Sequence, residues 1–472
     1  MGYFYGLAVI VVIFEGIIIQ CEGVGDATSS NRIPNAPSLE NDYLPLPYDL
    51  TEKIFCDFNF RTIRNAIRSG ILSATEPIVI KKLQNYIIHI TPYFRDPNRE
   101  YHEYGNLFLE FSSYRTLKSF FDNFGDHVRR IHIKYDRLYG VERNKKNLNI
   151  IKRYAKNLEE LQISCFVDEG FWEELSDGEN DIIFPEVKKF KYSGYNDRNE
   201  FKLNLMFPKL ESFKLMGKVA DVNCLANVKG LKELELDTNS IREDQLVDIF
   251  ANNMDMTRVF LPKPENTETM HSIVKYLTKL KTLEVEFPGE NFMLRAKNSP
   301  VYKLPSVTHF DISFVAFDEV FGIENLAFDM PNLENLTLKG NQADDRIVNF
   351  INYFEKLEIA ELLIQQYNAV EFIEKLKHIK ELTFFYENEL GCQLQFVSLK
   401  NIFEHFRKES ELQILKFLNF DESEYKTHED ELKGINIELK NFMKPTWTLS
   451  HGKQIETDQK FLMFRRDLAR NE

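Results

Sequence analysis

One short stretch, Pro331 to Asn341, constrains the fold more than any other part of the chain. It reads PNLENLTLKGN, in which Leu333, Leu336 and Leu338 fit the spacing LxxLxL. The last two leucines alternate with polar residues, which predicts a short strand with one buried face. A second copy with the same spacing, GLKELELDTN, begins at Gly230.

Looser copies of this pattern recur along most of the chain when any apolar residue is allowed at the three leucine positions. About twelve units then follow one another at a mean period of about 26 residues, which is typical of a repeat protein. Their first residues are Val128, Leu158, Val187, Leu210, Leu231, Met256, Leu280, Val307, Leu333, Leu357, Ile379 and Leu412. Chance does not produce this spacing so often.

The segments between the strands have the periodicity of helices instead. Three of them carry apolar residues at helical spacing: Ile347, Phe350, Ile351, Phe354 and Leu357; Ile273, Val274, Leu277 and Leu280; and Phe372, Ile373, Leu376 and Ile379. Each unit is therefore one short strand plus one amphipathic helix, and stacking the units buries the apolar sides of both. The predicted fold class is α/β, a solenoid of about twelve irregular strand and helix units.

This pattern resembles the leucine-rich-repeat proteins of the intracellular, helix-containing kind, and the resemblance covers residues 128–420. Asparagine, which that family places at the ninth position, stands there at Asn341 and Asn239. Most other units have a different residue there, among them Phe166, Lys218, Pro264, Pro288 and Gln365. The resemblance therefore implies an irregular solenoid with loops of uneven length.

Composition and motifs limit the function. The chain of 472 residues is 43% hydrophobic with a formal charge of -14, so it holds enough apolar material for a large core. The negative charge argues against a nucleic-acid or anionic-membrane surface and makes a basic partner easier to bind. The sequence contains no CxxC, HExxH, GxSxG, P-loop or Rossmann motif, and its histidines are scattered. We therefore predict a non-catalytic protein without a metal or cofactor.

The N-terminus predicts a secretory signal peptide over residues 1–23. Met1 to Gln20 is apolar except for Glu15, and the run from Gly6 to Phe14 has the length of a signal-peptide core. Cleavage is expected before Val24, which leaves no membrane segment. No Lys or Arg precedes the apolar run, so a membrane anchor or a misassigned start of the coding sequence remains an alternative. Residues 24–43, rich in Ser, Asn, Pro and Gly, are predicted to be a linker.

The cysteine pattern indicates a cytosolic protein, whereas the signal peptide indicates a secreted one. After cleavage only Cys56, Cys165, Cys224 and Cys392 remain, far apart in the sequence and without the close clusters of extracellular repeat proteins. The only glycosylation sequon begins at Asn335, inside a predicted strand. The body of the protein therefore suits a reducing cytosol, although its N-terminus predicts secretion.

A motif between linker and repeats carries the second resemblance. The stretch LPLPYDLTEKIFCDFNFRTIRNAI, Leu44 to Ile67, contains Leu46, Pro47, Asp49, Leu50, Ile54, Phe55 and Phe58 at the spacing that opens an F-box. Leu50, Ile54 and Phe58 lie four residues apart and form one apolar face of a helix that Pro47 begins. The resemblance implies that Leu46, Pro47, Leu50, Ile54, Phe55 and Phe58 dock on a Skp-type adaptor protein.

The alternative is a purely structural role, in which this helix only caps the N-terminal end of the solenoid, because repeat arrays need caps. The tryptophan-containing third helix of a usual F-box is not recognisable here. The predicted segments are residues 44–76 as the F-box-like part, 77–127 as a bridging region, 128–420 as the solenoid and 421–472 as a C-terminal cap. Within the bridging region we expect strands at Ile78–Ile80 and Tyr86–Ile90 and a helix at Tyr114–Asn123.

The order of signal peptide, F-box and irregular repeats resembles the secreted salivary F-box effectors of gall midges. This resemblance implies a protein delivered into host cytoplasm, where the F-box recruits a Skp-type adaptor and the repeats present a target protein to a cullin-type ubiquitin ligase. The alternative is an extracellular or intracellular repeat protein that binds proteins without a role in ubiquitin transfer, in which case an ordinary cytoplasmic location is also possible.

Positions three, five and seven of each unit are expected to face the concave side of the solenoid, where a target protein binds. Early units place basic residues there: Arg130, His132, Lys134, Lys189 and Lys191. Middle units place acidic residues there: Glu233, Glu235, Asp237, Glu284 and Glu286. Late units place apolar residues there: Ile359, Leu363, Phe385, Ile414 and Leu418. The acidic and the late apolar groups together are the predicted target site, and exposed apolar patches often mark interfaces. The alternative is that the C-terminal tail folds over the late group through Met443, Trp447, Leu449 and Phe461.

Overall fold

The structure is a computed structural model of the chain. It describes residues 60–68, 77–91, 100–103, 106–135, 141–165, 184–194, 203–217, 225, 227–237, 243–262, 267–287, 302–314, 328–342, 345–366, 375–385, 412–418, 447–453 and 460–466. The chain divides into two compact units, residues 1–85 and residues 86–472.

The described part of the first unit consists of two helices, α3 (Phe60–Arg68) and α4 (Pro77–Asn85). In α3, Phe60 and Ile63 are buried, and their spacing of three residues places them on the same helical face. The predicted adaptor-binding residues Leu46 to Phe58 lie outside the described residues.

Helix α4 corrects one expectation, because residues 78–80 were predicted to form a strand. Pro77 is the first residue of the helix, a position where its fixed φ and missing N–H cost nothing. Val79 and Leu83 are both about 2% exposed, so the four-residue spacing buries one helical face. This periodicity overrides the strand preference of the short Ile-Val-Ile run.

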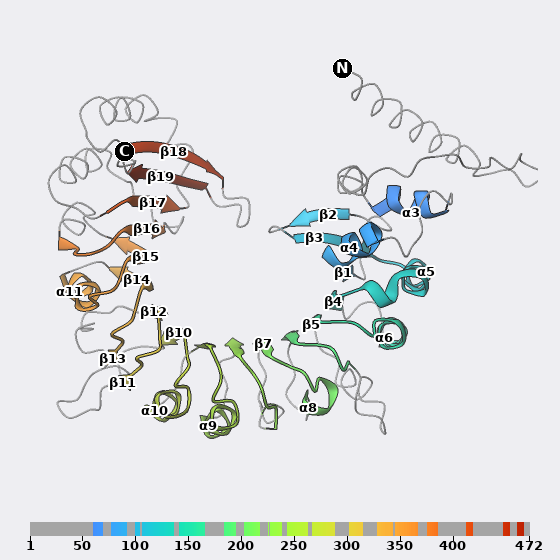
Figure 1. The fold of residues 1–472 in the computed structure, drawn as a ribbon, viewed down its shortest axis with the longest axis horizontal. Helices are drawn as coiled ribbons and strands as arrows, with labels where there is room; N and C mark the ends of the chain where they lie inside the picture. Colours follow the sequence, from blue (N-terminus) through green and yellow to red (C-terminus); the bar gives the residue numbers. More distant parts are fainter. Residues whose placement is uncertain are drawn as a thin grey trace, which may run out of the picture. The chain divides into compact units, whose positions relative to one another are not determined.

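The second unit is built on one open sheet of seventeen strands (Figure 1). Fourteen of them run parallel, in the spatial order β3 (Asn106–Phe111), β1 (Tyr86–Ile90), β4 (Arg130–Tyr135), β5 (Glu160–Cys165), β6 (Lys189–Gly194), β7 (Ser212–Met216), β8 (Glu233–Asp237), β9 (Arg258–Pro262), β10 (Thr282–Phe287), β12 (His309–Phe314), β14 (Asn335–Gln342), β15 (Ile359–Gln366), β16 (Glu381–Phe385) and β17 (Ile414–Leu418). Antiparallel strands extend both edges: β2 (Glu100–Glu103) beside β3, and β19 (Lys460–Arg466) beside β17, followed by β18 (Trp447–Lys453). A separate pair is formed by β11 (Tyr302–Lys303) and β13 (Phe328–Asp329).

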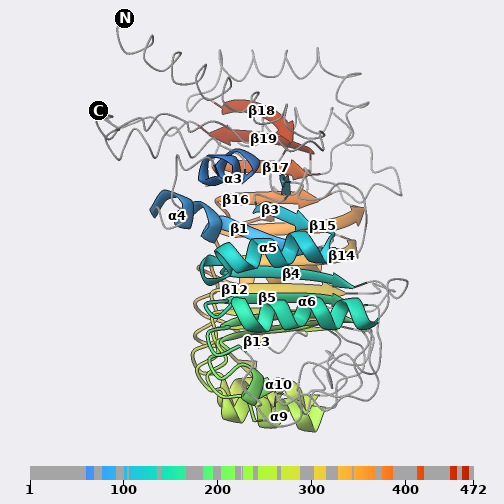
Figure 2. The same ribbon diagram turned by 90° about the vertical axis from the view of Figure 1, so that its right-hand side faces the viewer.

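Helices lie on one face of this sheet (Figure 1), and Figure 2 shows the part covered by α5 and α6. They are α5 (Tyr114–Phe124), α6 (Val141–Tyr154), α8 (Leu203–Met206), α9 (Glu243–Asn252), α10 (Thr267–Tyr276) and α11 (Asp345–Tyr353), with a 3-10 turn η1 (Gly125–His127) after α5. The helix expected over residues 114–123 is thus confirmed as α5. The helices expected from the apolar residues at 273–280 and 347–357 are present as α10 and α11, but they end at Tyr276 and Tyr353, so Leu277, Leu280, Phe354 and Leu357 lie in the turns that follow. Most of the helix expected over residues 372–379 lies outside the described residues. Among the described helices, none combines the length and apolar composition needed to cross a bilayer.

The strands confirm the spacing of the sequence repeat. Each of the twelve predicted first residues lies two positions before the start of a strand, and all twelve are between 0% and 4% exposed. The second and fourth strand residues, such as Leu283 and Val285 of β10, are buried beneath the helices. The described region is therefore a solenoid-like stack of strand and helix units with a continuous apolar core.

A repeated turn joins each helix to the next strand. The backbone N–H of Leu280 donates to the carbonyl of Leu277 at 3.1 Å, and the N–H groups of Lys281 and Thr282 both donate to the carbonyl of Thr257 in the preceding unit. The same bonds recur at the turns before β5, β7, β14 and β15. Backbone groups of the turns and strand starts are thus paired between neighbouring units.

One turn uses a buried polar residue where most others place an apolar one. Asn253 is 3% exposed; its side-chain oxygen accepts the Leu231 N–H at 2.9 Å, and its amide donates to the carbonyls of Val228 and Ile249, both at 2.9 Å. This side chain therefore ties the end of α9 to the loop that precedes β8.

Candidate functional site

The face of the sheet opposite the helices is called the open face here. Its side chains come from the first, third and fifth residues of the strands in the repeat units and from Ile87 and His89 in β1, because side chains alternate between the two faces. Parallel pairing aligns them in rows; one row contains Arg130, Glu160, Lys189, Ser212, Glu233 and Arg258. A partner can thus contact several strands through side chains held at fixed spacing.

The open face is hollowed along β1 and β3 to β9, with a volume of about 750 Å³. Its lining contains six lysine and arginine residues against three glutamates, on a chain whose formal charge is -14. These charged residues are Arg130, Lys134, Lys189, Lys191, Lys214, Arg258, Glu160, Glu233 and Glu235. The hollow is therefore more positive than the protein as a whole.

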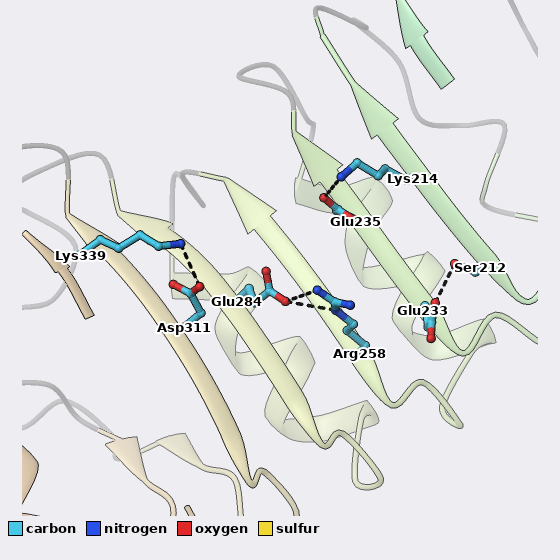
Figure 3. A network of polar contacts seen from close by, with 8 residues as sticks. All are labelled: Ser212, Lys214, Glu233, Glu235, Arg258, Glu284, Asp311 and Lys339. Carbon is cyan, nitrogen blue, oxygen red and sulfur yellow. Dashed lines mark hydrogen bonds and ion pairs between the residues drawn. The ribbon is translucent and has the colours of Figure 1, made fainter. Parts of the chain in front are cut away.

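Glu233, Glu235 and Glu284 of the predicted acidic group lie on the open face, and the last two form ion pairs with cations on neighbouring strands (Figure 3). Glu235 pairs with Lys214, and the guanidinium of Arg258 reaches Glu284 at 2.5 Å. Glu233 accepts a hydrogen bond from the Ser212 hydroxyl at 2.8 Å. The two ion pairs neutralise the charge that a basic partner would meet at Glu235 and Glu284.

The same pattern continues at β12 and β14, where Lys339 and Asp311 form an ion pair at 2.9 Å (Figure 3). Glu286 is half-buried on β10, and the side chain of Asp237 lies outside the described residues. Lys214 and Arg258 were not among the predicted site residues. Both could have been identified from the sequence, because Lys214 is the fifth residue of the unit that begins at Leu210 and Arg258 is the third residue of the unit that begins at Met256. These are positions expected to face the concave side.

The early basic group lies together on β4 and β6, as the sequence predicts. Lys191 pairs with Glu160 at 3.2 Å, whereas Lys134 and Lys189 are exposed and have no ion pair with a described residue. This end of the hollow therefore has cations that remain accessible to a ligand.

Two stacked histidines form the floor beside these cations. The rings of His89 and His132 lie 4.9 Å apart at an interplanar angle of 16°, and His132 Nε2 lies 3.1 Å from the Ser164 hydroxyl. Burial, with Lys134 nearby, lowers the pKa of His89 to about 4. Burial and the neighbouring His89 lower the pKa of His132 to about 3. Both rings are therefore neutral at pH 7 and present flat aromatic surfaces. His89 was missed because β1 precedes Val128, the first residue of the first predicted unit, although Leu83, Tyr86 and Ile88 have the LxxLxL spacing.

The late apolar group is only partly available on the open face. Ile359 and Ile414 are half-buried, Leu418 is 4% exposed, and the side chains of Leu363 and Phe385 lie outside the described residues. The tail strands β18 and β19 extend the sheet edge beside β17 as antiparallel strands. Because Leu418 is buried, it offers little surface to a partner in this structure.

No group of three or more histidine, cysteine or acidic side chains suited to a metal ion occurs among the described residues. Comparisons with known proteins add no assignment, because no protein-family model and no curated protein matches the chain. The function must therefore be argued from the open face and from the motifs in the sequence.

Proposed function

We propose that this chain is a substrate-recognition adaptor of a Skp-cullin-type ubiquitin ligase. The open face of the sheet binds a target protein, and Leu46, Pro47, Leu50, Ile54, Phe55 and Phe58 bind the Skp-type adaptor. The protein is itself non-catalytic in this scheme. Its N-terminal segment directs secretion, and the mature protein acts in the cytoplasm of a host cell.

The observation that best supports target binding is the hollow of about 750 Å³ on the open face. Strand pairing holds its charged side chains in register, so a partner can contact several units at once. The adaptor part of the proposal rests on the sequence motif that precedes the sheet. Leucine-proline at the start of a predicted amphipathic helix, followed by Ile54 and Phe55, would supply the apolar face that such adaptors bind.

Co-purification with a Skp-type adaptor tests the proposal. We expect wild-type protein to retain the adaptor and the double variant Leu50→Ala, Ile54→Ala to lose it, because truncating two of the three residues of one helical face removes most of its apolar contact area. The matched control is Arg61→Ala with Lys81→Ala, which changes two exposed residues of the same unit and should retain the adaptor. Circular dichroism should show that the sheet of the double variant still unfolds at the wild-type temperature.

Two results would refute the adaptor role. One is the absence of adaptor from wild-type purifications, and the other is equal retention by the double variant. Either result, combined with specific capture of a protein by the open face, would favour the alternative of a repeat protein that binds its partner without a role in ubiquitin transfer.

A further inference from the structure

Five cations converge on one part of the hollow. The strands β4 to β7 contribute Arg130, Lys134, Lys189, Lys191 and Lys214 to its lining, and we call these five residues the basic wall. The same four strands contribute only one carboxylate, Glu160, to the lining.

Neighbouring acids neutralise the basic wall only in part. Lys191 pairs with Glu160, and Lys214 pairs with Glu235 on β8. Lys134 and Lys189 are exposed, and neither has an ion pair within the part of the chain that the structure describes.

The strand register also brings like charges together. Lys191 and Lys214 are direct neighbours across β6 and β7, and like charges in such positions repel each other. An anion between the two strands would relieve this repulsion. Because a concave wall concentrates the field of its charges, the hollow can attract acidic ligands even though the protein carries a net negative charge.

We propose that the basic wall binds an extended acidic segment of a protein partner. The inference rests on the proposed target-binding role of the open face and names the chemistry of the target. Carboxylates of the segment contact Lys134, Lys189 and Arg130, while the stacked rings of His89 and His132 form a neutral floor beside them.

The spacing of the wall suits a peptide that crosses the strands. Arg130 and Lys189 occupy the same row two strands apart, which corresponds to about 10 Å between their Cα atoms. In a peptide with the extended polyproline II conformation, residues three positions apart lie on the same side and about 9 Å apart, so acidic side chains at that spacing match these two cations.

The acidic residues of the hollow favour a peptide over a nucleic acid. Glu160, Glu233 and Glu235 lie in the same lining as the basic wall. A nucleic acid has a phosphate at every nucleotide and would meet these carboxylates, whereas a peptide can place uncharged residues opposite them.

Fluorescence anisotropy with the full chain tests the inference. The probe is a labelled twelve-residue peptide of the repeat Glu-Ser-Gly, and the control probe has glutamine in place of each glutamate. The test variant is Lys134→Glu with Lys189→Glu. The matched control is Lys156→Glu with Lys229→Glu, which makes the same change in net charge at two exposed lysines outside the lining of the hollow.

We expect wild type to bind the glutamate peptide and not the glutamine peptide. The test variant should bind it about tenfold more weakly, because each reversal replaces an attraction with a repulsion at short range, whereas the control variant should stay within about twofold. Equal binding by both variants would overturn the inference. Tighter binding of a twelve-nucleotide single-stranded DNA than of the peptide would also overturn it, in favour of a nucleic-acid ligand.

Adaptor co-purification of the test variant separates this inference from the proposed function. Both lysines lie on the open face, far in sequence from Leu46 to Phe58, so the test variant should retain the Skp-type adaptor. Loss of peptide binding with adaptor retained supports both proposals. Absence of adaptor from wild type, with peptide binding intact, refutes the ligase role alone.

Discussion

Asn253 provides the most direct test of how the repeat is held together. Its side chain makes three buried hydrogen bonds, to the Leu231 N–H and to the carbonyls of Val228 and Ile249. Replacing it with alanine leaves up to three polar groups without partners. A buried unsatisfied group costs about 1–3 kcal/mol, so Asn253→Ala should reduce the free energy of unfolding by about 3–5 kcal/mol, allowing for partial relaxation.

A leucine variant distinguishes hydrogen bonding from space filling. The equivalent residue of other turns is apolar, as at Leu277 and Leu304, and both are buried. If the turn needs only an apolar filler, Asn253→Leu should be at least as stable as wild type. If the three hydrogen bonds matter, it should lose about 2–4 kcal/mol despite the added apolar contacts.

Urea denaturation followed by circular dichroism measures both variants. The control is Asn123→Ala, which removes a single exposed bond to the Ser119 carbonyl and should cost less than about 1 kcal/mol. Hydrogen exchange at the Leu231 amide reports the local effect, because that proton loses its acceptor. A loss below about 1 kcal/mol in Asn253→Ala, with unchanged protection of that amide, would refute the reasoning.

Two further predictions concern pH and packing. The pKa values of His89 and His132 are lowered to about 4 and about 3, so both histidines bind protons less readily in the folded state than in the unfolded state. The free energy of unfolding should therefore be highest above about pH 6.5 and fall as the pH drops toward 3. The double variant to phenylalanine should remove about 2 kcal/mol per histidine of the loss between pH 7 and pH 4.5, and an unchanged pH profile in urea titrations would contradict this. Gly125→Ala should lower the free energy of unfolding by about 1–3 kcal/mol, because a Cβ there would lie 2.8 Å from the Tyr154 Cβ. A Cβ at Gly230 would meet nothing within 4 Å, so Gly230→Ala should cost only about 1 kcal/mol, which comes from the positive φ of 88°. Equal stability of wild type and Gly125→Ala in urea denaturation would show that α5 and α6 do not pack as described.

The sequence predicted the repeat well because its signal is local and repeated. Buried positions within each strand alternate with a period of two, and the first apolar residue of every unit closes the same turn, so twelve copies reinforce one another. The Ile78–Ile80 strand was wrong because a three-residue run carries little periodicity of its own. The inclusion of β1 and β3 in the large sheet was missed for two reasons. In β3 the position that begins the LxxLxL pattern is Asn106, and the copy formed by Leu83, Tyr86 and Ile88 at β1 precedes the first unit that was identified.

The candidate site was harder to predict, because its properties depend on contacts between units rather than within one. Glu235 is recognisable as an open-face residue from its own repeat, but its partner Lys214 lies in the preceding repeat at the same row. Comparing equivalent positions of successive units would have placed the two side by side. The burial of Leu418 depends on more than the repeat around it, since β19, which pairs with β17, comes from a distant part of the chain.

Pairing across the rows also changes which partner charge the open face favours. The net charge of -14 makes a basic partner easier to bind at long range, and the group from Glu233 to Glu286 was expected to attract one. Charges are screened beyond about 8 Å at physiological ionic strength, so a docked ligand responds to the residues around it rather than to the net charge. Glu235 and Glu284 form ion pairs with Lys214 and Arg258, whereas Lys134 and Lys189 form no ion pair with a carboxylate among the described residues. A ligand that reaches the hollow therefore meets accessible positive charge first, and raising the salt concentration should weaken its binding while leaving the paired acidic region little affected.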